Sequence, residues 1–135
     1  MNGTILVTDT LFIGPEHIQA LNQADYEVVR LEESAATEEE LIANVQGKVG
    51  YILGGTEKVT PAVIQAADQL KAIVFTGTDW QHFIPGYDHA TEKGILIANA
   101  PGANAYSVAE YTVMLILLML RRGLELGSTC TTKFL

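Results

Sequence analysis

The chain has 135 residues and a mass of 14.6 kDa, a length that corresponds to one domain. Hydrophobic residues make up 48% of it and charged residues 18%, which favours a folded core over a disordered chain. The 8 basic and 16 acidic residues give a net charge of −8, which argues against binding to nucleic acid through its phosphates and against docking on anionic membranes.

Short apolar segments alternate with helical patterns along the chain. Strands are predicted at residues 4–8, 26–31, 49–53, 72–75 and 95–98. Between them, one helix begins at Pro15, one follows a Thr37–Glu40 capping box and one follows Thr60-Pro61. A weaker helical pattern spans residues 87–93, and a final helix spans residues 105–122. Strands separated by helices indicate an α/β fold with a doubly wound, five-stranded parallel sheet.

Several of these strands are almost entirely apolar, which predicts helices on both faces of the sheet. Ligands of such sheets bind beyond the carboxyl ends of the strands. The loops at residues 9–14, 54–57, 76–79 and 99–104 are therefore the candidate binding segments. Gly54-Gly55-Thr56 has two interpretations: a simple turn, or a nest of N–H groups that holds a carboxylate.

The final helix has no polar stripe, since residues 113–120 are all apolar. A helix that is apolar all round must be covered all round, and one small sheet covers only one side of it. We therefore expect a homo-oligomer, most simply a dimer, assembled through residues 105–122. The predicted organisation is a domain at residues 1–102, this helix at residues 103–122, and an irregular tail at residues 123–135.

The chain has one cysteine, Cys130, which excludes an internal disulfide and a thiolate zinc site and indicates a reducing, cytoplasmic setting. Residues 1–10 do not have the pattern of a signal peptide. The apolar run at residues 113–120 is shorter than the roughly 20 residues that cross a bilayer. No metal site is predicted.

The most specific segment is residues 94–110. Its GILIANAPG stretch, followed after one residue by NAYSVAE, resembles the end of the substrate-binding domain of the D-isomer-specific 2-hydroxyacid dehydrogenases, which include glycerate, phosphoglycerate and formate dehydrogenases. Residues 75–84, FTGTDWQHFI, are similar to the fourth strand of that domain and its Gly-rich exit. The resemblance extends over residues 1–122. By itself, Ser107-x-x-Glu110 also matches a capping box.

This resemblance implies a flavodoxin-like domain that closes over a Rossmann domain binding NAD or NADP, with the substrate between the two. It implies substrate contacts from a small set of loop residues: Leu53, Gly54, Gly55, Thr56, Gly77, Thr78 and Asn104. It implies that Ser107 and Val108 face the nicotinamide. The whole enzyme would interconvert a 2-hydroxy acid and a 2-oxo acid. The chain departs from the family at Asp79, where a glycine is expected, and at Ile84-Pro85, where Ile-Asp is usual.

The sequence contains no G-x-G-x-x-G fingerprint, and neither the catalytic arginine nor the Glu–His pair of the family. The three histidines do not replace them: His17 lies in the first turn of a helix, His82 in an irregular loop and His89 in a weak helix, all as surface residues. We therefore expect a truncated chain with no catalytic residue of its own, no tightly bound cofactor and only weak binding of a small carboxylate.

Two other functions share the predicted architecture. One is an autonomous flavodoxin-like module that binds a small anion, or a partner through the final helix. The other is a receiver-like signalling domain. The receiver pattern fits poorly, because no acidic pair accompanies Asp9 and no lysine follows the fifth strand.

Overall fold

The computed structural model describes residues 1–9, 11–31 and 36–121. It divides the chain into two compact units, Met1–Pro101 and Gly102–Leu135, which are described separately. The predicted tail at residues 123–135 lies outside the described residues, as does Cys130.

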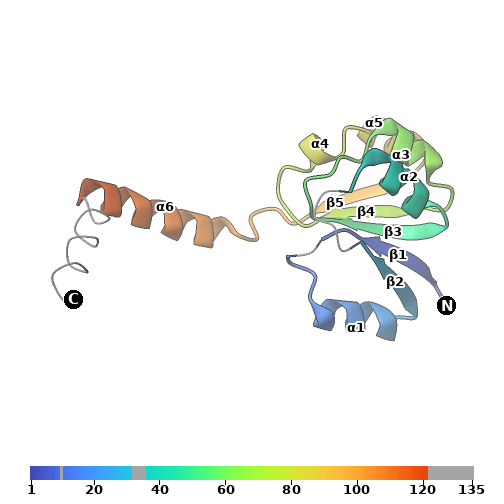
Figure 1. The fold of residues 1–135 in the computed structure, drawn as a ribbon, viewed down its shortest axis with the longest axis horizontal. Helices are drawn as coiled ribbons and strands as arrows, with labels where there is room; N and C mark the ends of the chain where they lie inside the picture. Colours follow the sequence, from blue (N-terminus) through green and yellow to red (C-terminus); the bar gives the residue numbers. More distant parts are fainter. Residues whose placement is uncertain (10, 32–35, 122–135) are drawn as a thin grey trace. The chain divides into compact units, whose positions relative to one another are not determined.

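The first unit is a five-stranded parallel sheet in the order β2-β1-β3-β4-β5, with a helix after each of the first four strands (Figure 1). The strands are β1 (Gly3–Val7), β2 (Tyr26–Arg30), β3 (Lys48–Leu53), β4 (Ala72–Phe75) and β5 (Leu96–Asn99). The helices are α1 (Pro15–Gln23), α2 (Glu38–Val45), α3 (Pro61–Ala66), α4 (Trp80–Phe83) and α5 (Tyr87–Glu92). The predicted α/β, doubly wound parallel fold is confirmed.

The hydrophobic core lies on one face of this sheet, beneath α2, α3 and α5 (Figure 1). Its fully buried side chains include Leu6 and Tyr51 from the strands and Leu41 and Ile64 from the helices. Trp80 packs against this core and meets Tyr87 edge-on, with ring centroids 5.7 Å apart.

The other face of the sheet carries α1 (Figure 1), and part of it is open. Val74 on β4 is 39% exposed and Leu96 on β5 is 72% exposed. The expectation that helices cover both faces is therefore wrong for this part of the sheet. The almost wholly apolar strands had predicted two covered faces. In the structure α1 contacts β2, whereas α2 and α3 pack against each other on the opposite face of the sheet.

Local sequence signals set the helix starts as predicted. The Thr37 hydroxyl accepts from the backbone N–H of Glu40 at 3.3 Å, and the Glu40 carboxylate accepts from the Thr37 N–H at 2.8 Å. The Thr60 hydroxyl accepts from the backbone N–H of Val63 at 3.4 Å and so caps α3, and Pro15 and Pro61 occupy first-turn positions. These contacts satisfy N–H groups that have no partner within a helix.

One local prediction differs from the structure. His82 lies in the short helix α4 rather than in an irregular loop, although it is exposed as expected. The final helix begins where predicted: α6 (Ala105–Leu120) has Asn104 as its N-cap residue, so Ser107, which also matches a capping-box pattern, lies in its first turn. A capping-box pattern cannot locate a helix start when the preceding residues also adopt helical geometry.

The second unit contains α6, which has 16 residues and no buried side chain. Because residues 113–120 are all apolar, apolar side chains occupy every side of this part of the helix, as predicted. Within the described part of the chain, no helix is long and apolar enough to span a membrane.

We predict that Thr37→Ala lowers the free energy of unfolding by about 1 kcal/mol, because it removes the acceptor that satisfies the Glu40 N–H. Urea denaturation followed by circular dichroism measures the change. Thr37→Ser, which keeps the hydroxyl, serves as the control and should stay close to the original chain. Equal losses in both variants would contradict the role of the cap.

Candidate substrate site at the carboxyl edge of the sheet

The carboxylate of Asp9 joins the loops that follow β1 and β4. Its Oδ1 accepts from the backbone N–H groups of Leu11 at 2.8 Å and Phe12 at 2.7 Å. Its Oδ2 accepts from the hydroxyl of Thr76 at 2.6 Å. Thr76 in turn donates its backbone N–H to the carbonyl of Leu53 at 3.0 Å, at the end of β3. Three strand ends are thereby fixed to one another.

These hydrogen bonds determine the protonation of Asp9. Asp9 is fully buried, and burial alone raises a carboxyl pKa. The hydrogen bonds from Thr76 and from the N–H groups of Phe12, Leu11 and Ile13 outweigh that effect and hold the pKa of Asp9 below its ordinary value. Asp9 is therefore a carboxylate at neutral pH.

Arg30, the last residue of β2, closes the same edge. Its Nη2 donates to the carbonyl of Asp9 at 2.9 Å and its Nη1 to the carbonyl of Ile13 at 3.0 Å. Its Nε is buried without a hydrogen-bond partner among the described residues. The guanidinium thus holds the loop after β1 in place.

Gly54 and Gly55 lie directly against two carboxyl groups. A Cβ added at Gly54 would approach the Asp9 carboxylate to well under 3.0 Å, and one at Gly55 would do the same to the carboxyl of Glu57. Neither glycine is among the residues with positive φ. The glycines are therefore required by close packing, and the alternating right- and left-handed backbone of one type of anion nest does not form here.

Glu57 is the last of three buried polar side chains that lie in a row under this loop, after Thr8 and Tyr51. Its side chain is 5% exposed, and its Oε1 accepts from the Tyr51 hydroxyl at 3.3 Å. The Tyr51 and Thr8 hydroxyl oxygens are 3.2 Å apart. Burial and the adjacent Glu57 raise the pKa of Tyr51, against the hydrogen bond with Thr8. The Oε2 of Glu57 is buried and has no hydrogen-bond partner among the described residues.

The loop after β4 is attached to the end of β5. The carbonyl of Gly77 accepts from the Ala100 N–H at 3.1 Å, and the carbonyl of Thr78 accepts from the Asn99 side chain at 3.0 Å. A Cβ at Gly77 would fall 2.7 Å from the Phe75 ring. Within the first unit, the described residues of the predicted segments after β1, β3, β4 and β5 therefore form one continuous edge.

The predicted site residues separate into two groups. Gly54, Gly55, Thr56, Gly77 and Thr78 lie on this edge, all partly or fully exposed. The side chain of Leu53 is fully buried in the core, so this residue offers only its backbone.

The other predicted site residues, Asn104, Ser107 and Val108, belong to the second unit. They are exposed at the start of α6.

Sequence reasoning placed Asp9, Thr76 and Glu57 in the candidate loops but did not single them out as the residues that organise the edge. For Asp9 a signal existed, because it directly follows the first strand, but its partner Thr76 is 67 positions away. The Nδ1 of His17 accepts from the backbone N–H of Gly14 at 3.0 Å, within the start of α1.

Comparison with known proteins identifies the family. Residues 5–134 match the model of the catalytic domain of D-isomer specific 2-hydroxyacid dehydrogenases. The chain belongs to this family. It is 35% identical over 118 residues to D-3-phosphoglycerate dehydrogenase of Homo sapiens, a match that covers 87% of this chain and 21% of the relative. It is 38% identical over 88 residues to glyoxylate reductase of Thermofilum pendens, covering 64% of this chain and 25% of the relative.

The chain therefore spans about a fifth of the length of the first of these relatives. Among solved structures, a protein of Thermus thermophilus is similar with a TM-score of 0.78 and 28% identity, over 90% of this chain and 38% of that one. The NAD+-bound 3-phosphoglycerate dehydrogenase of Entamoeba histolytica shares the fold, with a TM-score of 0.75 and 22% identity over 91% of this chain and 41% of that one.

We predict that Thr76→Val lowers the free energy of unfolding at pH 7 by about 1.5–3 kcal/mol, because a buried carboxylate loses a hydrogen-bond donor. It also raises the pKa of Asp9. A carboxyl whose pKa is lower in the folded state stabilises the fold above its unfolded pKa, and this contribution disappears as pH falls through the folded pKa.

The difference between Thr76→Val and the original chain should therefore shrink at acid pH. Urea denaturation at pH 7 and at successively lower pH values measures it, with Thr76→Ser as the control that retains the donor. A difference that is independent of pH would show that lost packing, and not the carboxylate, is responsible.

Proposed function

We propose that this chain is the substrate-binding part of an NAD(P)-dependent D-2-hydroxyacid dehydrogenase, an oxidoreductase that interconverts 2-hydroxy and 2-oxo acids. The observation that carries the proposal is the single edge built from four strand-end loops around Asp9, in a chain of this family. Open α/β sheets bind their ligands at this edge. The single cysteine supports a reducing, cytoplasmic setting.

In this proposal the substrate carboxylate lies against the backbone of Gly54, Gly55 and Thr56. The absence of a Cβ at the two glycines lets an anion approach their N–H groups closely. Gly77 and Thr78 line the same edge, and Asn104 contributes a side-chain amide from the start of α6. Each of these groups binds or orients the substrate, and none of them transfers a proton.

A nicotinamide cofactor would supply the hydride. Ser107 and Val108 fit its nicotinamide end, because they are exposed on the first turns of α6 and offer one hydroxyl and one apolar side chain. The sequence has no glycine-rich cradle for the cofactor's phosphates. This chain therefore contributes to one end of the cofactor site and does not hold the cofactor by itself.

We predict that the chain by itself does not oxidise NADH in the presence of glyoxylate, hydroxypyruvate or pyruvate, because it lacks a general acid–base pair and a cofactor cradle. Turnover above background with any of them would contradict this.

The positive test is a titration with glycolate followed by amide resonances. Shifts should concentrate at Gly54, Gly55 and Thr56. Gly47 and Gly94, which lie in turns at the opposite edge of the sheet, serve as internal controls. Shifts that spare the Gly54–Thr56 loop would exclude the proposed site.

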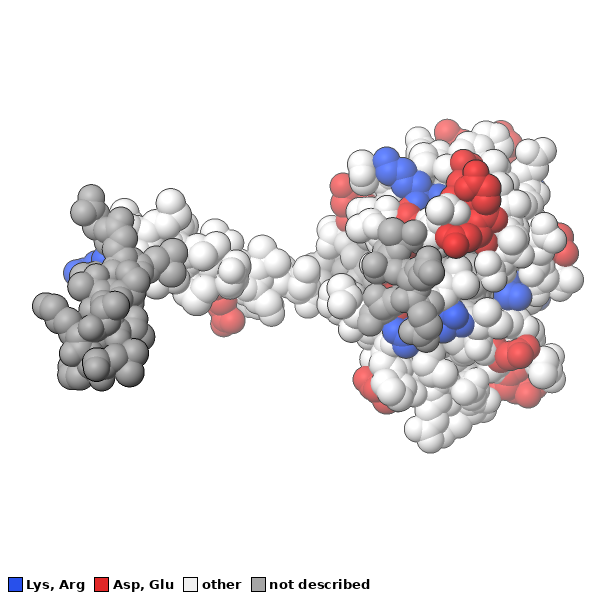
Figure 2. Space-filling model, in the orientation of Figure 1, with Lys and Arg blue, Asp and Glu red and all other residues white. Residues whose placement is uncertain are grey.

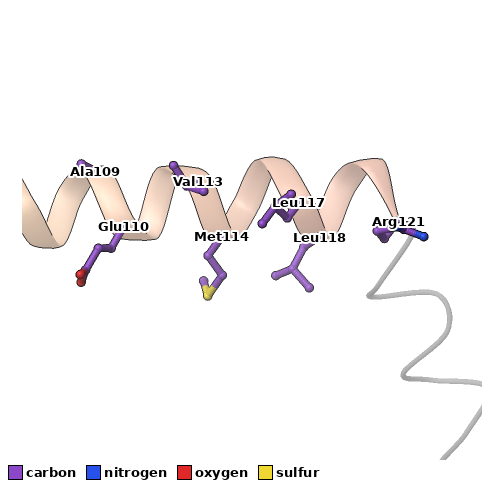
Figure 3. Close-up of a pocket in the computed structure, with 7 residues that line it drawn as sticks. All are labelled: Ala109, Glu110, Val113, Met114, Leu117, Leu118 and Arg121. Atoms are coloured by element: carbon purple, nitrogen blue, oxygen red, sulfur yellow. The ribbon is translucent and has the colours of Figure 1, made fainter.

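We also propose that α6 mediates a homodimer. Its exposed residues include Met114, Leu117 and Leu120, at 44%, 56% and 75%. Figure 3 shows Glu110, Met114 and Leu118 projecting from one side of α6, as their spacing of four residues requires. Leaving several such side chains in water forgoes roughly 1.5–3 kcal/mol each, which in sum is comparable to the stability of a domain.

We predict that replacing Leu117 and Leu118 together by lysine dissociates the dimer or causes aggregation, as measured by light scattering at micromolar concentration. Thr112→Gln, a polar replacement on the same helix, is the control and should leave the mass unchanged. A soluble monomer of the original chain with α6 helical would refute the proposed dimer.

A further inference from the structure

Acidic groups gather at the carboxyl edge of the first unit, where the substrate is proposed to bind. The Asp9 carboxylate lies against Gly54 and the Glu57 carboxyl lies against Gly55. Asp79, which follows Gly77 and Thr78 in the loop after β4, is exposed. Two of the three groups are thus buried directly beneath the loop that would receive the substrate carboxylate, and the third borders the same edge.

Most basic groups of this unit lie at the opposite edge. Lys48 begins β3, Lys71 precedes β4 and Lys93 comes shortly before β5, so all three lie at the amino ends of parallel strands. Lys93 is also hydrogen-bonded to the end of α3. Its Nζ donates to the carbonyls of Ile64, Gln65 and Ala67 at 2.9, 3.0 and 3.1 Å.

Two described basic residues of this unit remain at the carboxyl edge. Arg30 directs both Nη atoms to backbone carbonyls and buries its Nε. Lys58 follows Glu57 and is exposed, as Asp79 is, so solvent and salt screen both of these charges. On the face drawn in Figure 2, basic side chains likewise form small separate groups among acidic ones.

We propose that this edge selects a substrate with a single negative charge, a 2-hydroxy or 2-oxo acid without a phosphate group, and that Asp9, Glu57 and Asp79 determine this selectivity. The inference rests on the proposed function of the Gly54–Thr56 loop. Backbone N–H groups can satisfy one carboxylate, but every additional negative charge on the ligand is repelled by the same acidic groups. The repulsion grows in proportion to the ligand's charge, whereas the number of N–H donors stays fixed.

The test compares two ligands that differ by one phosphate, D-glycerate and 3-phospho-D-glycerate, titrated into the full chain and followed by the amide resonances of Gly54 and Gly55. At an ionic strength of about 0.01 M, where the Debye length is about 30 Å, the phosphorylated ligand should bind at least about tenfold more weakly. This difference in affinity between the two ligands should decrease as salt is added. Equal or tighter binding of 3-phospho-D-glycerate at this loop would overturn the proposal.

Two variants assign the selectivity to named residues. Glu57→Gln keeps an oxygen that accepts from Tyr51, and Asp79→Asn changes an exposed side chain. Each variant should reduce the difference in affinity between D-glycerate and 3-phospho-D-glycerate. If both variants remain folded and leave this difference unchanged, the assignment to these residues is wrong. If neither ligand shifts the Gly54 and Gly55 resonances while the chain is folded, the proposed function itself fails, a result distinct from a reversed preference.

Discussion

The hydrogen bonds to the Asp9 carboxylate are the constraint on which the candidate site depends. One side chain accepts from the loop after β1 and from Thr76 after β4, and Thr76 is bonded to the end of β3. Without them, a buried carboxylate would lose much stability or become protonated. With them, the loops after β1 and β4 are joined through one buried carboxylate, and the backbone bond from Thr76 to Leu53 adds the end of β3. The geometry of the proposed substrate loop therefore depends on Asp9, a buried residue that lies against Gly54.

The same constraint explains why two glycines stand side by side after β3. The sequence pattern allowed a simple turn at Gly54 and Gly55, or a nest whose N–H groups are open to a carboxylate. The structure shows negative φ at both, with the carboxyl groups of Asp9 and Glu57 occupying the space a Cβ would need. Open access for a ligand above the loop and close packing of carboxyl groups below it come from the same missing side chains. The two explanations are therefore compatible, but only the packing follows from the structure.

Much of the fold could be predicted from the sequence because its signals are local. The Thr37–Glu40 capping box joins residues three positions apart, and the apolar strands are contiguous. The organisation of the site could not be predicted, because its contacts join distant positions: Asp9 with Thr76, and Tyr51 with Thr8. The open part of the sheet was missed for a related reason. An apolar strand indicates that both of its faces are covered in the working protein. It does not indicate which segment covers them.

That last point applies to both units of the chain. Within the first, Val74 and Leu96 leave apolar surface on β4 and β5, and within the second, α6 exposes apolar side chains along its whole length. The first unit nevertheless has a complete core on the other face of its sheet, so its stability and the geometry around Asp9 do not depend on what covers α6. The geometry around Asp9 and the proposed assembly through α6 are thus physically separable. A substitution that disrupts assembly should leave the Asp9 network intact, since the described donors to Asp9 all come from the first unit and none from α6.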